Sequence, residues 1–119
     1  MIQQDLIEVS LRKEEAFYML ALHYDERSFQ SRLNILDADT IIHEVASCLK
    51  TFSSFSKETL ITLGATFAHQ LFDECEKYAE RVLATREGTN IIEITTLKYE
   101  YSLLRDREYV EDLLDELLQ

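Results

Sequence analysis

Residues 56–87 read SKETLITLGATFAHQLFDECEKYAERVLATRE, and this stretch decides the expected fold because Gly64 is its only helix-weakening residue. Apolar side chains recur three and four positions apart through it, which is the spacing of an α-helix. Ser56 is a suitable N-cap, and Gly88 stands where a helix C-terminus favours glycine. The stretch therefore predicts one continuous helix, on the order of 45 Å long at 1.5 Å per residue.

This long helix has two apolar stripes, whereas a helix on a protein surface needs one. With one side left uncovered, it would expose on the order of 1,000 Å² of apolar surface, more than a monomer usually shows. We therefore expect it to be covered on two sides, in part by a partner chain. The stripes are Leu60, Leu63, Phe67, Leu71, Tyr78 and Val82, and Ile61, Ala65, Ala68, Phe72, Cys75, Ala79 and Leu83.

The rest of the chain also predicts helices. It has no proline and two glycines in 119 residues, whereas strand-rich proteins use both residues in their turns. Residues 3–24 fit an amphipathic helix, and a second helix is expected to begin at Asp37 or Asp39. Only residues 89–94 are expected to be extended, because they are rich in β-branched side chains. The expected fold class is all-α.

The formal net charge is −11, and residues 108–119 are especially acidic. Phosphate contacts need a basic face, so we do not expect the chain to bind nucleic acid alone. Leucines on one side of this segment and carboxylates on the other predict an amphipathic helix. The carboxylates form either a solvated face or a surface that blocks a basic site on a partner: Glu108, Glu111, Asp112, Asp115 and Glu116.

No motif of a known catalytic or cofactor site is present in the sequence. His69 and Asp73 are four residues apart, with Glu76 nearby, but two helical ligands are weak evidence for a metal and a surface hydrogen bond is the simpler interpretation. Cys48 and Cys75 are interpreted as buried thiols in a reducing compartment. We expect no catalysis, cofactor, metal, small-molecule substrate or membrane contact, and a location inside the cell.

The order of elements, a short helix, a long helix, a short extended segment and a short helix, resembles the histone-fold family. The resemblance lies in residues 55–60, 75–80 and 89–98 and covers about residues 39–105. Within the family it is most similar to the centromere protein S branch and less so to the histone-fold TBP-associated factors. It implies obligate pairing with another histone-fold chain or with a second copy. DNA would be contacted only within such a complex.

The resemblance also implies domain limits and site residues. Residues 39–107 would be the histone-fold core and residues 108–119 the acidic helix, whereas residues 1–38, predicted as an N-terminal helical extension, have no counterpart in the family. The implied pairing surface is Leu60, Leu63, Phe67, Leu71, Phe72, Tyr78 and Val82. The implied DNA-facing residues are Lys50, Lys57 and Arg86, although the loop that is basic in the family here carries one arginine and one glutamate.

Two functional hypotheses follow. In the first, the chain is a histone-fold subunit of a chromatin, kinetochore, DNA-repair or transcription complex, and it is nuclear. In the second, it is a compact helical bundle, an inhibitor or immunity protein whose acidic face blocks a basic site on a partner. The second hypothesis requires antiparallel helices of similar length.

Overall fold

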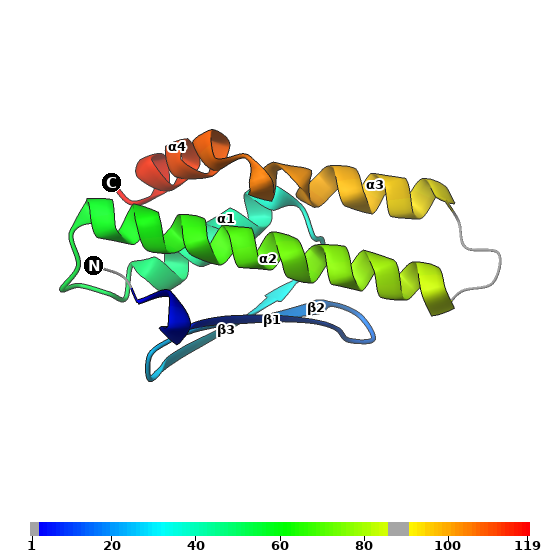
Figure 1. Cartoon of the computed structure of the whole chain (residues 1–119), viewed down its shortest axis with the longest axis horizontal. Helices are drawn as coiled ribbons and strands as arrows, with labels where there is room; N and C mark the ends of the chain where they lie inside the picture. Colours follow the sequence, from blue (N-terminus) through cyan, green and yellow to red (C-terminus); the bar gives the residue numbers. More distant parts are fainter. Residues whose placement is uncertain (1–2, 86–90) are drawn as a thin grey trace.

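The computed structural model describes residues 3–85 and 91–119 and has an α+β fold. The three strands form one antiparallel sheet in the order β1-β2-β3. This sheet lies along one side of α2, and α3 and α4 lie along the opposite side (Figure 1). In chain order the elements are η1 (Gln4–Leu6), β1 (Ile7–Lys13), β2 (Tyr18–Tyr24), β3 (Arg27–Leu33), α1 (Ala38–Leu49), α2 (Lys57–Thr85), α3 (Ile91–Tyr101), η2 (Ser102–Arg105) and α4 (Arg107–Leu117).

The all-α prediction, and the histone fold with it, is therefore wrong. The segment predicted as an N-terminal helical extension folds as the three-stranded sheet. Burial along β1 alternates: Ile7 and Leu11 are buried, whereas Glu8, Ser10 and Arg12 are exposed. This period of two is the pattern of a strand with one covered face. It outweighs the three-and-four spacing that suggested a helix.

The β2–β3 turn explains how this chain makes a hairpin without glycine or proline. Tyr24 pairs with Arg27, which leaves a loop of two residues. Asp25 adopts a left-handed backbone with φ of 58°. Aspartate is one of the few residues other than glycine that tolerate this conformation, and two-residue hairpin loops require it. The scarcity of glycine was therefore a misleading argument against strands.

The two main helix starts agree with the sequence prediction. The Asp37 carboxylate accepts the Thr40 backbone N–H at 2.9 Å and caps α1. The Ser56 hydroxyl accepts the Thr59 N–H at 3.2 Å at the start of α2. The 29 residues of α2 form one unbroken helix, as predicted. The predicted C-terminal cap, Gly88, lies outside the described residues.

The core is built around α2, and elements of the same chain cover that helix. Leu63, Phe67 and Leu71 each retain 0% exposed surface within this single chain. The sheet contacts α2 from one side, while α1, α3, η2 and α4 also pack against it. Burying each such side chain is worth roughly 1.5–3 kcal/mol. The sheet thus supplies cover that we expected from a partner chain, and these three side chains are buried without one.

The C-terminal third is helical, in part against expectation. The predicted extended run is wrong over residues 91–94, which form the first turn of α3, and its first two residues lie outside the described part of the chain. The terminal amphipathic helix is confirmed as α4. The Asp106 carboxylate caps it by accepting the Tyr109 N–H at 3.2 Å, and Val110 and Leu114 are buried.

Gly64 allows α1 and α4 to pack closely on α2. A Cβ atom added at Gly64 would lie 2.5 Å from Leu114 Cδ1 and 2.8 Å from Leu49 Cδ1. Both distances are shorter than a normal contact between carbon atoms. The position of α4, and of the surface that it carries, therefore depends on the absence of a side chain at residue 64. Within the described residues, no helix is long and apolar enough to cross a membrane.

Candidate functional site

Exposed large apolar side chains cluster near the start of α1. In the described part of the chain, those that stand out are Ile35, Tyr99 and Leu103, with exposed fractions of 42%, 80% and 44%. Tyr99 and Leu103 line one pocket of about 260 Å³, and Ile35 precedes its nearest lining residue by two positions. We call this pocket the Tyr99 pocket. Its lining residues are Asp37, Ala38, Asp39, Tyr99, Glu100, Ser102, Leu103 and Tyr109.

Three segments far apart in the sequence form the Tyr99 pocket. The N-terminus of α1 supplies two aspartates, the junction of α3 and η2 supplies the exposed apolar groups, and α4 supplies Tyr109. Tyr101 and Leu104 are 0% and 2% exposed, so they anchor the α3–η2 junction in the core. With these two side chains turned inward, Tyr99 and Leu103 face solvent.

Carboxylates surround the apolar part of the pocket. Asp37, Asp39 and Glu100 line it, and none of the lining residues is basic. The Asp37 carboxylate is held by its capping bond to the α1 backbone. Asp39 Oδ2 lies 3.6 Å from His43 Nδ1, and both side chains are about half exposed. The pocket thus combines apolar surface with negative charge, and a positively charged group fits it best.

Tyr109 connects the apolar and acidic parts of the pocket. Its hydroxyl donates a hydrogen bond to Asp39 Oδ1 at 3.4 Å. Burial raises the pKa of Tyr109, and the negative charges and hydrogen bond of the nearby aspartates, Asp39 first and then Asp37, raise it further. The hydroxyl therefore stays protonated at neutral pH and acts as a donor.

The acidic face of α4 continues from this pocket. Asp112 lies three residues after Tyr109, so the two side chains are neighbours on one face of the helix. Two of the predicted carboxylates are engaged in ion pairs: Glu111 with Arg107 at 2.9 Å and Asp115 with Lys57 at 2.8 Å. The remaining three, Glu108, Asp112 and Glu116, are exposed.

Three of the seven residues expected to pair with a partner have no exposed surface in the single chain. Leu63, Phe67 and Leu71 are fully buried by the chain itself, as described above. The other four are only partly exposed: Leu60, Phe72, Tyr78 and Val82. Three of these four, Leu60, Phe72 and Tyr78, pack against the chain's own core.

The structure describes two of the three expected DNA-facing residues, and these two do not form a basic face. Lys50 is the C-terminal cap residue of α1 and is exposed. Lys57, at the start of α2, is paired with Asp115 on α4. Arg86 lies outside the described residues. The two described lysines flank the loop between α1 and α2, and the acidic helix α4 contacts this end of α2 through the Lys57–Asp115 ion pair.

The two cysteines are buried free thiols, as expected from their apolar surroundings. Burial raises the pKa of Cys48 to about 11 and, together with nearby Glu74 and Glu76, that of Cys75 to about 12. Both thiols are therefore protonated at neutral pH, and a thiol is a poor nucleophile. His69 and Asp73 do not belong to any group of three potential metal ligands in the described parts of the chain.

Sequence reasoning missed the Tyr99 pocket. Tyr99 and Leu103 are four residues apart, and that spacing is the one signal available in the sequence.

Comparisons of the chain with protein-family models, with curated proteins and with solved structures find no match.

Proposed function

We propose that this chain is a non-enzymatic binding subunit that attaches, through the Tyr99 pocket, to a basic and partly apolar segment of a partner protein. The observation that carries the proposal is the meeting of exposed Tyr99 and Leu103 with three carboxylates in a pocket that has no basic lining residue. Isolated exposed apolar residues are ordinary, but a cluster of them with a polar rim is typical of an interaction site.

The apolar and acidic groups would have different roles. Tyrosine is one of the side chains that most often dominate binding energy, and Tyr99 has most of its surface to bury. Exposed ion pairs contribute little affinity, about 0–1 kcal/mol each. The carboxylates would instead orient the partner and raise the association rate. A segment with lysine or arginine next to a leucine or phenylalanine meets both requirements.

The proposal keeps one part of the second sequence hypothesis, the use of negative charge against a basic protein surface. It does not keep the helical bundle, because α1 and α2 have 12 and 29 residues and a sheet covers one side of α2. Nucleic acid is a poor occupant of this pocket, because its phosphates would meet Asp37, Asp39 and Glu100.

Charge-neutralising variants test the proposal without disturbing the fold. The triple variant Asp37→Asn, Asp39→Asn, Glu100→Gln removes the negative charge and keeps the α1 cap, because asparagine caps as well as aspartate. Tyr99→Ser separately removes the apolar contact. The matched control, Asp5→Asn, Glu26→Gln, Glu58→Gln, loses the same charge at exposed positions outside the pocket.

The probes are short synthetic peptides that combine lysine or arginine with leucine or phenylalanine, measured by fluorescence anisotropy at low and physiological salt. We expect the unmodified chain and the control to bind them, with affinity that falls as salt rises. The triple variant and Tyr99→Ser should each lose at least tenfold in affinity, about 1.4 kcal/mol. Equal binding by all four proteins, or equal binding of peptides with glutamate in place of lysine, would refute the proposal.

A further inference from the structure

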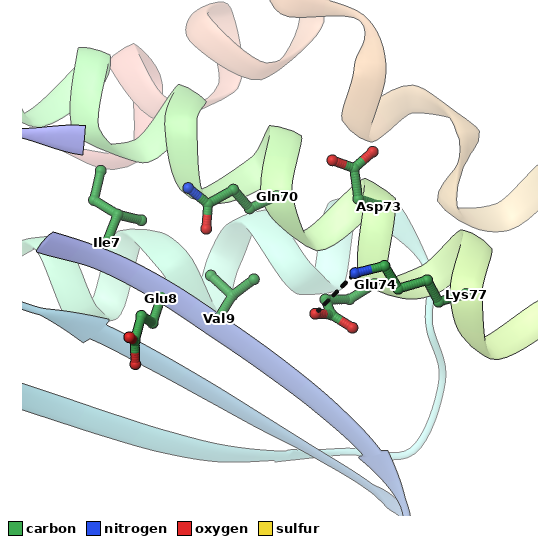
Figure 2. Close-up of a pocket in the computed structure, with 7 residues that line it drawn as sticks. All are labelled: Ile7, Glu8, Val9, Gln70, Asp73, Glu74 and Lys77. Atoms are coloured by element: carbon green, nitrogen blue, oxygen red, sulfur yellow. Dashed lines mark ion pairs between the residues drawn. The ribbon is translucent and has the colours of Figure 1, made fainter. Parts of the chain in front are cut away.

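Within residues 3–85 and 91–119, β1 is an edge strand with no strand on its outer side. The sheet order is β1-β2-β3, so β1 pairs only with β2. A groove of about 340 Å³ runs between β1 and α2, lined by Ile7, Glu8 and Val9 from the strand and by Gln70, Asp73, Glu74 and Lys77 from the helix. Figure 2 shows Ile7 and Val9 on the side of β1 that faces α2, and Glu8 on the opposite side.

The hydrogen-bond phase of β1 shows which backbone groups face this open edge. The Leu6 carbonyl accepts the Asp25 N–H at 3.0 Å, and the Glu14 N–H donates to the Phe17 carbonyl at 2.8 Å. These two bonds flank β1, so the backbone N–H and C=O groups of its even-numbered residues point towards β2. Backbone groups of alternate residues point to opposite sides of an antiparallel strand. Those of Ile7, Val9, Leu11 and Lys13 therefore point to the open edge.

The sequence of β1, Ile7-Glu8-Val9-Ser10-Leu11-Arg12-Lys13, is complementary to itself. In an antiparallel pair of two copies centred on Ser10, the residues whose backbone groups face outward meet one another, Ile7 with Lys13 and Val9 with Leu11. That is the condition for a ladder of hydrogen bonds. In the same register, Glu8 of each copy lies opposite Arg12 of the other. One two-fold axis thus satisfies the backbone hydrogen bonds, brings Val9 opposite Leu11, and pairs the charges of Glu8 and Arg12.

We infer that two copies of this chain associate through β1 and join their sheets into one six-stranded antiparallel sheet. Directly opposed charges of unlike sign stabilise neighbouring strands. Charges on edge strands usually prevent such pairing, but they do so by repulsion. Here the repulsive arrangement is absent, because Glu8 and Arg12 have opposite signs at equal distances from Ser10. Arg12 also lies 3.4 Å from Glu14 within one chain, and both side chains are well exposed, so this weak contact is easily exchanged.

The other edge of the sheet provides a contrast. The charged residues of β3 are Arg27 and Arg32, so a pair of β3 strands has no carboxylate to offer an arginine. Arg27 also donates to the Thr51 carbonyl at 2.9 Å, which ties this edge to the end of α1. Of the two edges, β1 is therefore the one that fits a second copy. This interface is separate from the Tyr99 pocket, so either can be correct without the other.

Charge reversal at two positions tests the inference by sedimentation analysis of the full chain over a range of concentrations. We expect the unmodified chain to dimerise. Glu8→Arg and Arg12→Glu should each weaken self-association by tenfold or more, because each places like charges opposite one another twice. The double variant should dimerise again, and an equimolar mixture of the two single variants should form a heterodimer.

Arg32→Glu is the matched control. Arg32 lies in the same cross-strand row as Arg12, through Met19, but on the opposite edge, and its change should leave the dimer intact. Recovery of pairing in the mixture cannot result from misfolding of either variant. A monomer at every concentration would overturn the inference. A dimer that persists in both single variants would overturn it as well.

Discussion

Replacing Gly64 with alanine tests how α4 is positioned, and the expected effect depends on the residue opposite. The new methyl group would lie 2.5 Å from Leu114 Cδ1 and 2.8 Å from Leu49 Cδ1. Both leucines are 0% exposed, so neither can rotate into solvent. Overpacking of this kind costs about 1–3 kcal/mol. Alanine in place of glycine within a helix returns about 1 kcal/mol. The variant should therefore be less stable by up to about 2 kcal/mol.

The same substitution should have the opposite sign when Leu114 is alanine. Leu114→Ala alone should cost about 2–5 kcal/mol, because it leaves a cavity beneath α4. It also removes the atoms with which the new methyl group collides, and the Leu49 side chain gains room to move. In this background Gly64→Ala should stabilise the chain by about 1 kcal/mol. The coupling between the two sites is therefore about 1–3 kcal/mol.

Urea denaturation of the four proteins, followed by circular dichroism, measures this coupling. At about 1–3 kcal/mol per molar urea, a difference of 1 kcal/mol moves the midpoint by a readily measured amount. The reasoning is refuted if Gly64→Ala changes stability equally in both backgrounds. Such a result would mean that α2 and α4 are not in close contact at Gly64. The position of Tyr109 in the Tyr99 pocket would then lack its structural basis.

Three further predictions concern stability. Burial raises the pKa of Tyr18 and of Cys75 to about 12, from ordinary values of 10.0 and 9.0, so the folded chain holds these protons more tightly than the unfolded chain. The contribution of these two groups to the free energy of unfolding should thus be constant up to about pH 8 and fall between about pH 9 and 12, and Cys75→Ala should flatten that fall in urea titrations at successive pH values. Asp37→Ala should lower the free energy of unfolding by about 1 kcal/mol, whereas Asp37→Asn should leave it nearly unchanged in the same assay; equal losses would show that the cap is unimportant. Asp25→Gly should raise the thermal midpoint slightly and Asp25→Val should lower it, by about 1–2 kcal/mol in stability, because only the first tolerates the left-handed backbone; the reverse order would contradict the turn geometry.

The helices whose ends are marked by local chemistry could be predicted from the sequence. Asp37 and Ser56 cap helices by bonds to residues three positions away, so their signal lies within one short segment. The strands were missed because the turn between β2 and β3 uses Asp25 in the left-handed conformation, where a glycine would have indicated a turn. In residues 3–24, apolar spacings of two and of three to four coexist, and the choice between them depends on what the segment packs against.

The candidate site was unpredictable for a different reason. Asp39 and Tyr109 are 70 positions apart, and nothing local to either residue indicates that they meet. Tyr99 becomes an exposed group only because Tyr101 is the side chain that turns into the core. Both facts depend on how α3, η2 and α4 fold back along α2, and the first turn of α3, residues 91–94, was wrongly predicted as an extended segment.

The dependence of every layer on α2 has a consequence for how the chain is made. The first 33 residues contain the three strands of the described chain, but Leu20 and Leu22 are buried in a core that also includes residues of α1 and α2, which are synthesised later. A nascent chain must therefore extend through α1 and into α2 before this core can form. Until then the apolar side chains of the sheet stay exposed, and chaperones recognise exposed apolar surface of this kind. Fragments that end before α2 should aggregate, because the sheet and α1 cannot bury their apolar side chains without that helix.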